Sequence, residues 1–446
     1  MKFYIKYLLL TLVLFSCDDF LEEKPSKDIV VPTNLEDLQA IIDNNGVMNL
    51  TTGLATLSAD EQTLTDIGWA ALASEIERNA YIWADNFFAG ESFTAEWDTP
   101  FRVIYYSNVV LDQLSNLDQS TNMADYNNVR GSALFFRAYA NYQLLELFTP
   151  AYDKTQASGV LGVPIKNTPF IDEAFDRGSQ QDSFDHLMAD LEEAYGLLPE
   201  TALFKTRPSK LVVDALRARI YFDIGEYGLA ESYAEKVLAK SSELIDFNTL
   251  TTAGLISFPR FSSEVIFHSY TIAYSYRTNV NLVVRKDLYD SFQDNDLRKS
   301  IYFRIRQGNV NFFGNLTGNL ALFTGFSVSE MMLISAEAKA RIDNFDGAMT
   351  IMNRLLSSRW LAGTYTPFEV ENDQVLGFVE EERQKEMMFR GRRWIDIKRL
   401  NSEGRGIVLN RNLNGVVYTL QPNDPKYAFP IPDIEIRVNG LEQNPR

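Results

Sequence analysis

The stretch ARIYFDIGEYGLAESYAEKVL, Ala218–Leu238, decides the fold because its pattern returns 118 positions further along the chain. The second copy is AEAKARIDNFDGAMTIMNRLL, Ala336–Leu356. The positions that correspond are Ala218, Tyr227, Ala230, Tyr233, Ala234, Val237 and Leu238 in the first copy and Ala336, Phe345, Ala348, Ile351, Met352, Leu355 and Leu356 in the second. Small residues at Ala218 and Ala230 allow two antiparallel helices to approach closely, and Gly225 supplies a stop for the first helix. Each copy is therefore predicted to form a helix–turn–helix unit.

The repeat is typical of tetratricopeptide-like helix pairs, and helical periodicity also fills most of the chain before it. Apolar residues at i, i+3, i+4, i+7 and i+8 of the second helix of each copy make a stripe that packs on neighbours. Residues 151–180 are predicted to be a loop. Residues 241–325 separate the copies with strand-like runs, Glu264–Ile272 and Asn281–Val284, and with Gly-rich loops, so a regular solenoid is not expected. The other predicted helices are Trp97–Leu117, Ala124–Phe148, Ser183–Leu198, Ser209–Ile224 and Tyr227–Ala239.

The N-terminus carries the pattern of a bacterial lipoprotein signal. Lys2 and Lys6 form a short basic region, Tyr7–Phe15 is an apolar segment too short to span a bilayer, and Cys17 follows the small residue Ser16. Because Cys17 is the only cysteine, it has no disulfide partner, and lipidation is its expected fate. An ordinary secretory signal with an incidental cysteine is the alternative. The expected organisation is a signal peptide over 1–16, a flexible tether over 17–34 and a folded domain over 35–446.

The chain is strongly acidic. Its 42 Lys and Arg against 60 Asp and Glu give a net charge of −18, and loss of two lysines with the signal peptide leaves −20. Such a surface repels phosphate backbones, and no basic stretch with interleaved aromatics offsets it, so nucleic acid is not an expected partner. The 46% of hydrophobic residues can bury a large core. No later apolar run approaches the length of a membrane span, so the lipid is the expected anchor.

Motifs for catalysis or metal binding are missing from the sequence. The only histidines, His186 and His268, lie far apart, and no HExxH, cysteine pair, Walker loop, Rossmann fingerprint or GxSxG elbow occurs. We therefore expect no metal and no cofactor. Asp60 and Glu61 are the acidic pair best placed for glycosidase chemistry, but adjacent residues of one strand or helix seldom point at the same bond. We predict that the protein is not an enzyme.

The segment EEERQKEMMFRGRR, residues 380–393, is predicted to be one charged helix. Its acidic residues lie at the N-terminal end and its arginines at the C-terminal end, as the helix dipole favours. Phe389 and Trp394 are expected to anchor this helix in the core, with the arginines paired to acidic neighbours. Trp97 is also expected in the core, and the position of Trp360 is left open.

A set of motifs, each weak alone, follows in order along nearly the whole mature chain. They are CDDFLEEKPS after the signal peptide, LSADEQ at 57–62, EWDTPFRVIYYSNVVLDQL at 96–114, RGSALFFRAYANYQLLELF at 130–148, GVPI at 162–165, RPSKLVVDALRARIYFDIGEY at 207–227, DLYDSFQDNDLRKSIYF at 287–303, SVSEMMLISAEAKARIDNFDGAMTIMNRL at 327–355, EEERQKEMMFRGRRWIDIKRL at 380–400 and FPIPDIEIRVNGLEQNP at 429–445. Together they resemble the SusD/RagB family, the surface lipoproteins of Bacteroidetes nutrient-uptake systems.

The resemblance implies a single, mostly α-helical domain with few short strands, built on four tetratricopeptide-like helix pairs with a loop-rich ligand-binding region. The helix pairs are expected within 97–148, 183–240 and 327–358. It also implies a lipoprotein of the outer membrane, facing the cell exterior, that captures an oligomeric ligand and delivers it to a SusC-like TonB-dependent transporter. A glycan is the favoured ligand, and a peptide stays open. The chain is short for the family, so trimmed ligand loops are expected.

Two stretches outside the repeat helices combine flat aromatic rings with groups that bind hydroxyls, the combination that suits sugars. One lies between LSADEQ and EWDTP, and the other lies between the two repeat copies. We expect them to form one exposed face, although core packing of any ring is the alternative. A surface glycan or peptide hydrolase and a tetratricopeptide-type interaction scaffold remain as other functions. The expected ligand-binding residues are Trp69, Arg78, Tyr81, Trp83, Tyr274 and Tyr276.

Overall fold

The computed structural model describes residues 34–117, 122–170 and 175–446. The expected signal peptide, the lipidated Cys17 and all of the expected tether except Asn34 lie outside these residues. Within the described ranges, no helix is both long and apolar enough to cross a membrane. Helices dominate this part of the chain, and no sheet in it has more than two strands. The expected mostly α-helical fold is confirmed.

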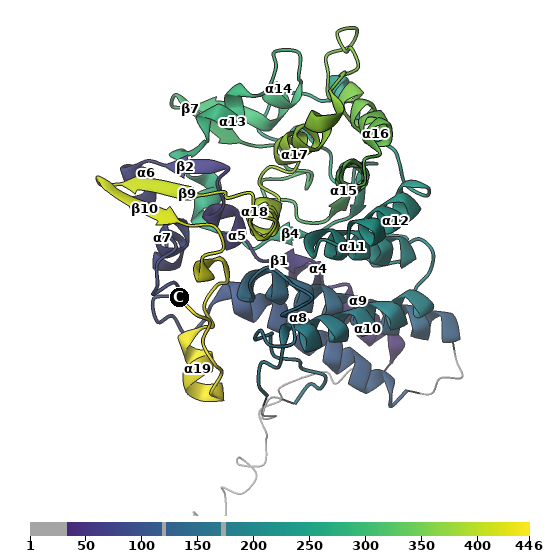
Figure 1. Cartoon of the computed structure of the whole chain (residues 1–446). Helices are drawn as coiled ribbons and strands as arrows, with labels where there is room; N and C mark the ends of the chain where they lie inside the picture. The colour runs from purple at the N-terminus through teal and green to yellow at the C-terminus, as the bar shows by residue number, and fades with distance from the viewer. Residues whose placement is uncertain (1–33, 118–121, 171–174) are drawn as a thin grey trace, which may run out of the picture.

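Two groups of long helices form the scaffold (Figure 1). The first group consists of α8 (Ala95–Leu114), α9 (Met123–Phe148) and α10 (Gln180–Leu197). The second group consists of α11 (Lys210–Asp223), α12 (Tyr227–Leu238), α15 (Val328–Arg341) and α16 (Phe345–Ser357). Helix α9 packs between α8 and α10, while α12 packs against both α11 and α15. Packed neighbouring helices thus lie in each of the three ranges expected for helix pairs, and the repeat corresponds to α11–α12 and α15–α16.

The middle of helix α9 is enclosed on all sides. Every residue from Gly131 to Leu145 is buried, because α8 and α10 cover two of its sides and the ring of Phe267 packs against those of Phe135 and Tyr139. A helix in this position needs no polar face, which explains the near-continuous apolar run in the sequence. Its one buried guanidinium, Arg137, donates two 2.7 Å hydrogen bonds to the carboxylate of Asp190 on α10.

Side chains and a glycine set the helix ends close to their predicted positions. Ser179 and Asp182 form a capping box that starts α10 at Gln180, three residues earlier than predicted. Ser209 caps α11 by accepting a hydrogen bond from the N–H of Val212. Gly225, with φ of +79°, takes the left-handed conformation that ends the first helix of the repeat.

The remaining helices are shorter, and the strands form isolated pairs (Figure 1). The helices are α3 (Leu35–Ile42), α4 (Asn45–Met48), α5 (Leu54–Ser58), α6 (Asp66–Ala70), α7 (Glu75–Ile82), α13 (Lys286–Asp290), α14 (Arg298–Tyr302), α17 (Val375–Glu386), α18 (Arg392–Ser402) and α19 (Asp433–Asn439). The antiparallel pairs are β2 (Gln62–Leu64) with β5 (Leu282–Val284), β3 (Val265–Phe267) with β8 (Phe326–Ser327), β6 (Phe303–Arg306) with β7 (Asn309–Phe312), and β9 (Leu409–Leu413) with β10 (Val416–Leu420). The parallel pair is β1 (Leu50–Thr51) with β4 (Tyr270–Thr271). Pairs β1–β4 and β2–β5 join the N-terminal segment to the stretch between the repeat copies.

The Gly-rich segment 308–325, expected to be loop, is largely packed into the core. It contributes strand β7, and most residues of 311–317 and 322–325 are buried. At Gly325 an added Cβ would lie 1.9 Å from the carbonyl oxygen of Phe267. The glycine therefore permits a close approach of two backbones that any side chain would prevent.

The prediction of one charged helix over residues 380–393 is wrong. The segment is divided between α17 and α18, with Phe389 at φ of +57° and Gly391 at φ of +73° in the turn between them. Arg392 and Arg393 therefore begin α18 instead of ending a longer helix, so the dipole argument does not apply to them. The expected burial of Phe389, Trp394 and Trp97 is confirmed, and Trp360 is also buried.

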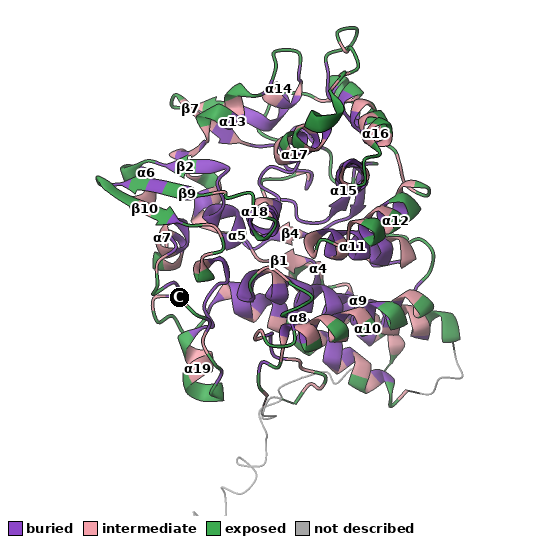
Figure 2. Ribbon diagram, viewed as in Figure 1, coloured by how far each residue is buried: buried purple, intermediate pink, exposed green. Residues whose placement is uncertain are grey.

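Among the arginines of residues 380–393, Arg383 pairs with Asp396 at 3.1 Å, as expected. Further arginines pair with acidic side chains in the interior, the buried zone that crosses the centre of Figure 2. Arg298, fully buried, donates hydrogen bonds to Asp296 and, at 2.6 Å, to Glu382. Arg359, also fully buried, donates 2.8 Å hydrogen bonds to Glu264 and Glu386. Breaking such a pair on one side leaves an uncompensated charge in a region of low dielectric.

Helix α18 contacts both helical groups and the loop-rich part of the molecule through charged side chains. Arg392 donates to Glu146 of α9 and, at 2.6 Å, to Asp223 of α11. Arg393 donates at 2.7 Å to Asp60, which follows α5. Arg399 donates at 2.7 Å to Glu337 of α15. The helix lies near the centre of the molecule and joins both helical groups to the loop-rich part (Figure 1).

Replacement of Glu386 should destabilise the fold strongly. Glu386 faces Arg359 and also lies 3.5 Å from Arg298, so Glu386→Gln leaves both guanidinium groups short of counter-charge. We expect a loss of about 3–5 kcal/mol in the free energy of unfolding at pH 7, measured by urea titration. The exposed Glu369→Gln serves as the matched control and should change it by less than about 0.5 kcal/mol.

The carboxylate of Glu386 should also make the stability of the fold depend on pH. Burial opposes ionisation of Glu386, but Arg359 and Arg298 outweigh it and lower its pKa to about 2. An unfolded glutamate titrates near pH 4.3, so this stabilisation is complete above about pH 5 and is lost as the pH falls towards about 2. The Glu386→Gln variant should lose less stability over this range than the unaltered protein. An equal loss in both would contradict the assignment.

Candidate ligand-binding surface

The structure brings the two predicted ligand-binding stretches together. Helices α6 and α7 carry the first stretch, and the residues after β4 carry the second. The carboxylate of Glu77 accepts 2.9 Å hydrogen bonds from the hydroxyl of Ser275 and the N–H of Tyr276. The same serine hydroxyl accepts from the N–H of Ala73. The two stretches therefore form one structural unit, with Glu77 as the residue that joins them.

The expectation that all the predicted rings are exposed is wrong for three of them. Tyr81, Trp83 and Tyr276 are 2%, 3% and 0% exposed. The hydroxyl of Tyr81 accepts from the N–H of Leu64, and Trp83 donates through Nε1 to the carbonyl of Ser58. Tyr276 donates through its hydroxyl to the carbonyl of Gly53 at 2.8 Å. These rings pack in the core because their polar ends have partners there.

Arg411 closes the interior around two of these rings. Its guanidinium carbon lies 4.5 Å from the ring centre of Tyr81 and 5.1 Å from that of Trp83. Arg411 itself is buried and donates to the carbonyl of Ala59. Residues more than 300 positions apart in sequence thus decide the burial of Trp83, which local sequence does not reveal.

The other predicted residues remain half-exposed. Trp69 donates through Nε1 to the carbonyl of Arg78 at 3.0 Å, and Arg78 donates to the carbonyl of Leu72. Tyr274 donates through its hydroxyl to Glu96 at 3.0 Å. Each side chain is held by a hydrogen bond from its polar group and is partly exposed. The candidate ligand-binding surface is therefore reduced to Trp69, Arg78 and Tyr274, with the half-exposed Arg277 beside them.

Sequence reasoning missed Glu77 and Ser275 as the residues that hold this surface. Ser74 and Glu77 form the capping box of α7, and Glu77 then accepts across the chain from Ser275. The Ser-x-x-Glu spacing is a recognised signal for the start of a helix and would have placed α7. No pattern in the local sequence indicates that Glu77 also holds residues 275–276.

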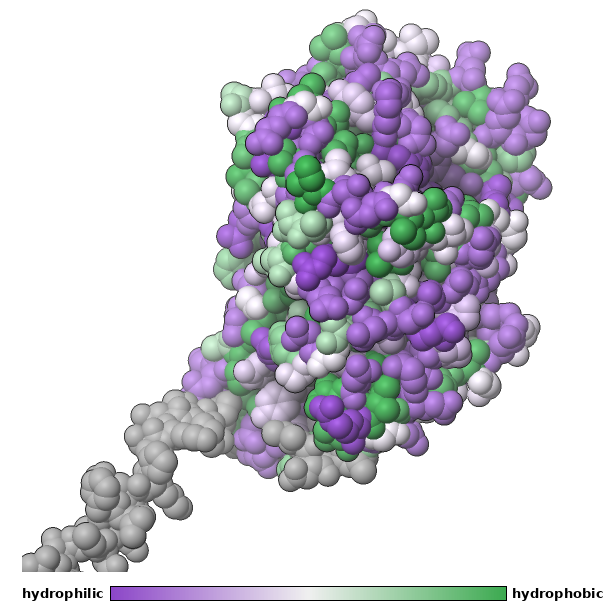
Figure 3. Space-filling view, turned by 90° about the vertical axis from the view of Figure 1, so that its left-hand side faces the viewer, coloured by the Kyte–Doolittle hydropathy of each residue, from purple (hydrophilic) through white to green (hydrophobic). Residues whose placement is uncertain are grey.

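The outer face near this surface is chemically mixed. On the side of α6 and the β9–β10 hairpin, apolar side chains lie in separate groups among polar ones (Figure 3). Ile67 on α6 and Val416 and Val417 on β10 are exposed apolar residues of this part of the chain. Such a surface offers shallow contacts to a ligand that is itself part apolar and part polar, as sugars are.

Asp60 and Glu61 are held inside the protein. Burial would raise the pKa of Asp60, but the guanidinium groups of Arg393 and Arg285 outweigh it and hold this pKa below its ordinary range. Burial raises the pKa of Glu61 to about 8. Divergent pKa values occur in catalytic acid pairs, but these two carboxyls are nearly inaccessible and already bound by interior partners. The geometry leaves no place for a glycosidic bond between them.

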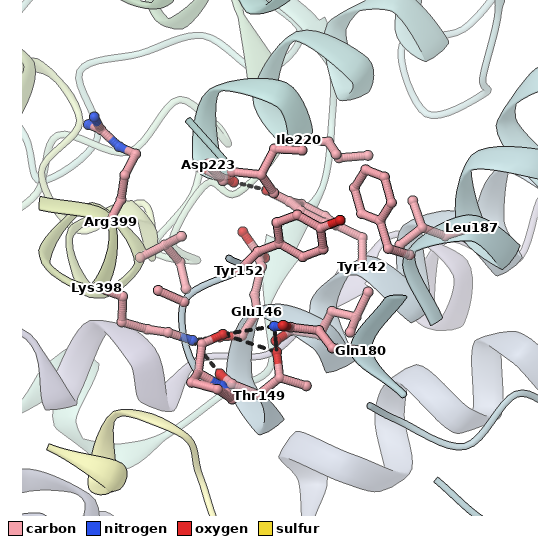
Figure 4. A pocket seen from close by; sticks show the side chains of 16 residues that line it. Tyr142, Glu146, Thr149, Tyr152, Gln180, Leu187, Ile220, Asp223, Lys398 and Arg399 are labelled. Carbon is pink, nitrogen blue, oxygen red and sulfur yellow. Dashed lines mark hydrogen bonds between the residues drawn. The ribbon is translucent and has the colours of Figure 1, made fainter. Parts of the chain in front are cut away.

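A cavity of about 60 Å³ lies where α9, α10, α11 and α18 meet (Figure 4). Lys398 donates 2.7 Å hydrogen bonds to the carbonyls of Glu146 and Thr149, and burial lowers the pKa of its ammonium group to about 8. The remaining walls are largely apolar, with Leu187 and Ile220 among them. A cavity of about 150 Å³ holds benzene, so one of about 60 Å³ is too small for a sugar ring.

The histidines belong to the packed structure. His268 is buried and its ring packs edge-on against Phe261, while His186 lies 3.8 Å from Asp190. Burial lowers the pKa of both imidazoles, which favours their neutral forms. No group of three or more His, Cys, Asp or Glu side chains in the described ranges could hold a metal ion.

Comparison with known families identifies the chain. A family model described as starch-binding and associating with the outer membrane matches residues 19–222. The SusD family model matches residues 259–446. The chain therefore belongs to the SusD/RagB family, a class of binding proteins.

Known relatives agree with this assignment. The SusD-like protein P2 of Formosa agariphila is 23% identical, over all of this chain and 99% of its own length. A SusD superfamily protein from Bacteroides thetaiotaomicron has a TM-score of 0.72 at 21% identity, covering 93% of this chain and 100% of that structure. A SusD-like carbohydrate binding protein from Bacteroides vulgatus has a TM-score of 0.68 at 21% identity, covering 92% and 97%. These structures share the fold of this chain.

The burial of Trp83 predicts that its replacement acts on stability. Trp83→Ala removes a buried indole and its hydrogen bond to Ser58, so we expect a loss of about 3–5 kcal/mol in the free energy of unfolding, measured by urea titration. The half-exposed Trp69→Ala is the control and should cost less. A Trp83→Ala protein of unaltered stability would contradict the placement of this ring in the core.

Proposed function

We propose that the protein is a lipid-anchored protein of the outer-membrane surface that captures an oligomeric nutrient and delivers it to a SusC-like TonB-dependent transporter. The observation that carries the proposal is the succession of the two family models along residues 19–222 and 259–446. A glycan is the favoured ligand, since the first model is described as starch-binding and one structural relative as carbohydrate binding.

Capture without catalysis is supported by the described side chains. Asp60 and Glu61 are buried and bound by interior partners, whereas Trp69, Arg78 and Tyr274 keep accessible parts. Partly exposed rings beside a partly exposed guanidinium suit the C–H faces and hydroxyls of a sugar. The alternative of a scaffold that binds polypeptide on its helical repeat is less favoured because α17 packs on α15 and α18 packs on α11.

Replacement of Trp69 should weaken ligand binding. If the indole stacks on a sugar, Trp69→Ala should cost about 1–3 kcal/mol in binding free energy. We propose isothermal titration against malto-, cello-, laminari- and xylo-hexaoses, with the protein in a detergent without a sugar head group. Phe204→Ala, which alters an exposed ring outside the candidate surface, is the control. Affinity that is equal in Trp69→Ala and the unaltered protein would remove Trp69 from the site.

Replacement of Cys17 should release the protein from the membrane. A single cysteine after Leu14-Phe15-Ser16 is the expected lipid attachment site, and a lipid with two or more acyl chains anchors stably. Cys17→Ala should move the protein to the soluble fraction, whereas Ser16→Ala, which keeps a small residue before the cysteine, should stay in the membrane. A Cys17→Ala protein that still needs detergent for extraction would contradict lipid anchoring.

The transporter partnership is tested in native membranes. Affinity purification of the tagged protein from outer membranes in mild detergent should recover a large TonB-dependent barrel protein. Recovery of this chain alone under those conditions would contradict a stable complex.

A further inference from the structure

We propose that a groove between α8, residues 165–170 and α19 is a second ligand-binding site, and that its ligand is a neutral oligosaccharide. The inference rests on the proposed function, because it gives the capture protein a further point of contact with an oligomer. None of the residues expected from sequence to bind ligand lines this groove.

The groove is large and lined by aromatic rings. Its volume is about 630 Å³, within the range of about 300–1,000 Å³ that is usual for ligand sites. Tyr105 on α8 is 40% exposed and Phe170 is 67% exposed, while the buried Trp97 lies at its floor. Phe175 also lines the groove. Exposed rings that gather at a hollow are unusual unless they contact a ligand.

Buried hydrogen bonds hold the loop wall in place. Asn108 of α8 donates to the carbonyls of Lys166 and Thr168 at 3.0 and 3.1 Å. Its carbonyl oxygen accepts at 2.9 Å from Arg137 of α9, which is itself paired with Asp190 of α10. Three helices thus fix the backbone next to Phe170. A wall ordered before binding lowers the entropy that a ligand loses on association.

Polar groups alternate with the rings along the groove. Asp98 in the first turn of α8 and Glu435 on α19 both line it. Burial raises the pKa of Asp98, and repulsion from Glu435 adds to this effect, while a hydrogen bond from the N–H of Thr94 opposes it. Asn439 donates to Glu435. The ammonium group of Lys166 lies 3.6 Å from the ring centre of Phe175. Carboxylate and amide groups beside flat rings suit sugar hydroxyls and C–H faces.

The shape of the groove favours an oligomer. An adjoining hollow of about 320 Å³ shares Lys166 and Phe175 with the groove, so the recess continues past this pair. Asp98 and Glu435 outnumber Lys166 among the charged residues that line the groove, so an anionic sugar is disfavoured. Two of the walls are helices, whose backbone groups are already bonded, so the groove offers no strand edge for an extended peptide.

The groove is tested with two exposed rings removed together. Tyr105→Ala combined with Phe170→Ala leaves the buried floor and the Asn108 contacts intact, so the fold should be kept, which circular dichroism checks. The full mature lipoprotein is titrated with the same four hexaoses, and native mass spectrometry counts the bound sugars. We expect occupancy of one site to fall at least about tenfold in the double variant. Phe204→Ala and Tyr105→Phe should retain it.

Two of the possible outcomes bear on the groove alone, and a third bears on the proposed function as well. If the double variant binds as many sugars as the unaltered protein, with equal affinity, the groove is not a site, while capture of glycans stands. If a basic peptide such as hexalysine binds and the double variant loses it while sugars are unaffected, the ligand class is wrong. If the unaltered protein binds no sugar of the panel, the sugar assignment of the groove and the glycan part of the proposed function both fail.

Discussion

The charged contacts of α18 are the interaction on which the rest of the structure depends. Arg392 joins α9 to α11, Arg399 reaches α15, and Arg393 reaches the residue after α5. Arg392 and Arg399 are buried and Arg393 is partly buried, so their charges lie where an unpaired charge is costly and a paired one specifies a single arrangement of its partners. One helix of modest length thereby sets both helical groups and the loop-rich part in a fixed relation.

That fixed relation positions the candidate ligand-binding surface. Asp60, held by Arg393, follows α5 and precedes β2, which pairs with β5 from the stretch between the repeat copies. Glu77 adds a second connection to that stretch through Ser275. The partly exposed Trp69 and Tyr274 are therefore held by hydrogen bonds to their surroundings, and the wall of the groove beside α8 is held in the same way by Asn108. Sites held this way bind without first being ordered.

The sequence predicted the helical scaffold well because its signals are local. The repeat located α11–α12 and α15–α16, and the apolar run of α9 followed from helical periodicity. The break between α17 and α18 was missed because the charges on both sides fitted one helix, although Gly391 marks the turn. A glycine within a helical pattern is often tolerated, so Gly391 alone did not indicate a break between two helices.

The candidate site was predictable only in part. The stretches around Trp69 and Tyr274 were placed together correctly, but the burial of Trp83 depends on Ser58 and Arg411, which are distant in sequence. The groove was missed because its aromatic ring was taken as part of a packed helix, whereas it is exposed. Tyr105 lies on the same helix as the core residue Trp97, and only the packing of α19 and residues 165–170 shows that Tyr105 faces a hollow.

Hydrogen–deuterium exchange tests the central claim most directly, namely that a rigid body centred on α18 presents ligand contacts only at its accessible edges. Exchange in the full mature protein should be slowest in α9, α15 and α18, and a bound hexaose should slow exchange near residues 69–78, 274–277 or along the groove while leaving α18 unchanged. Exchange in α18 as fast as in α19, or ligand protection confined to α11, α12 and α16, would contradict it.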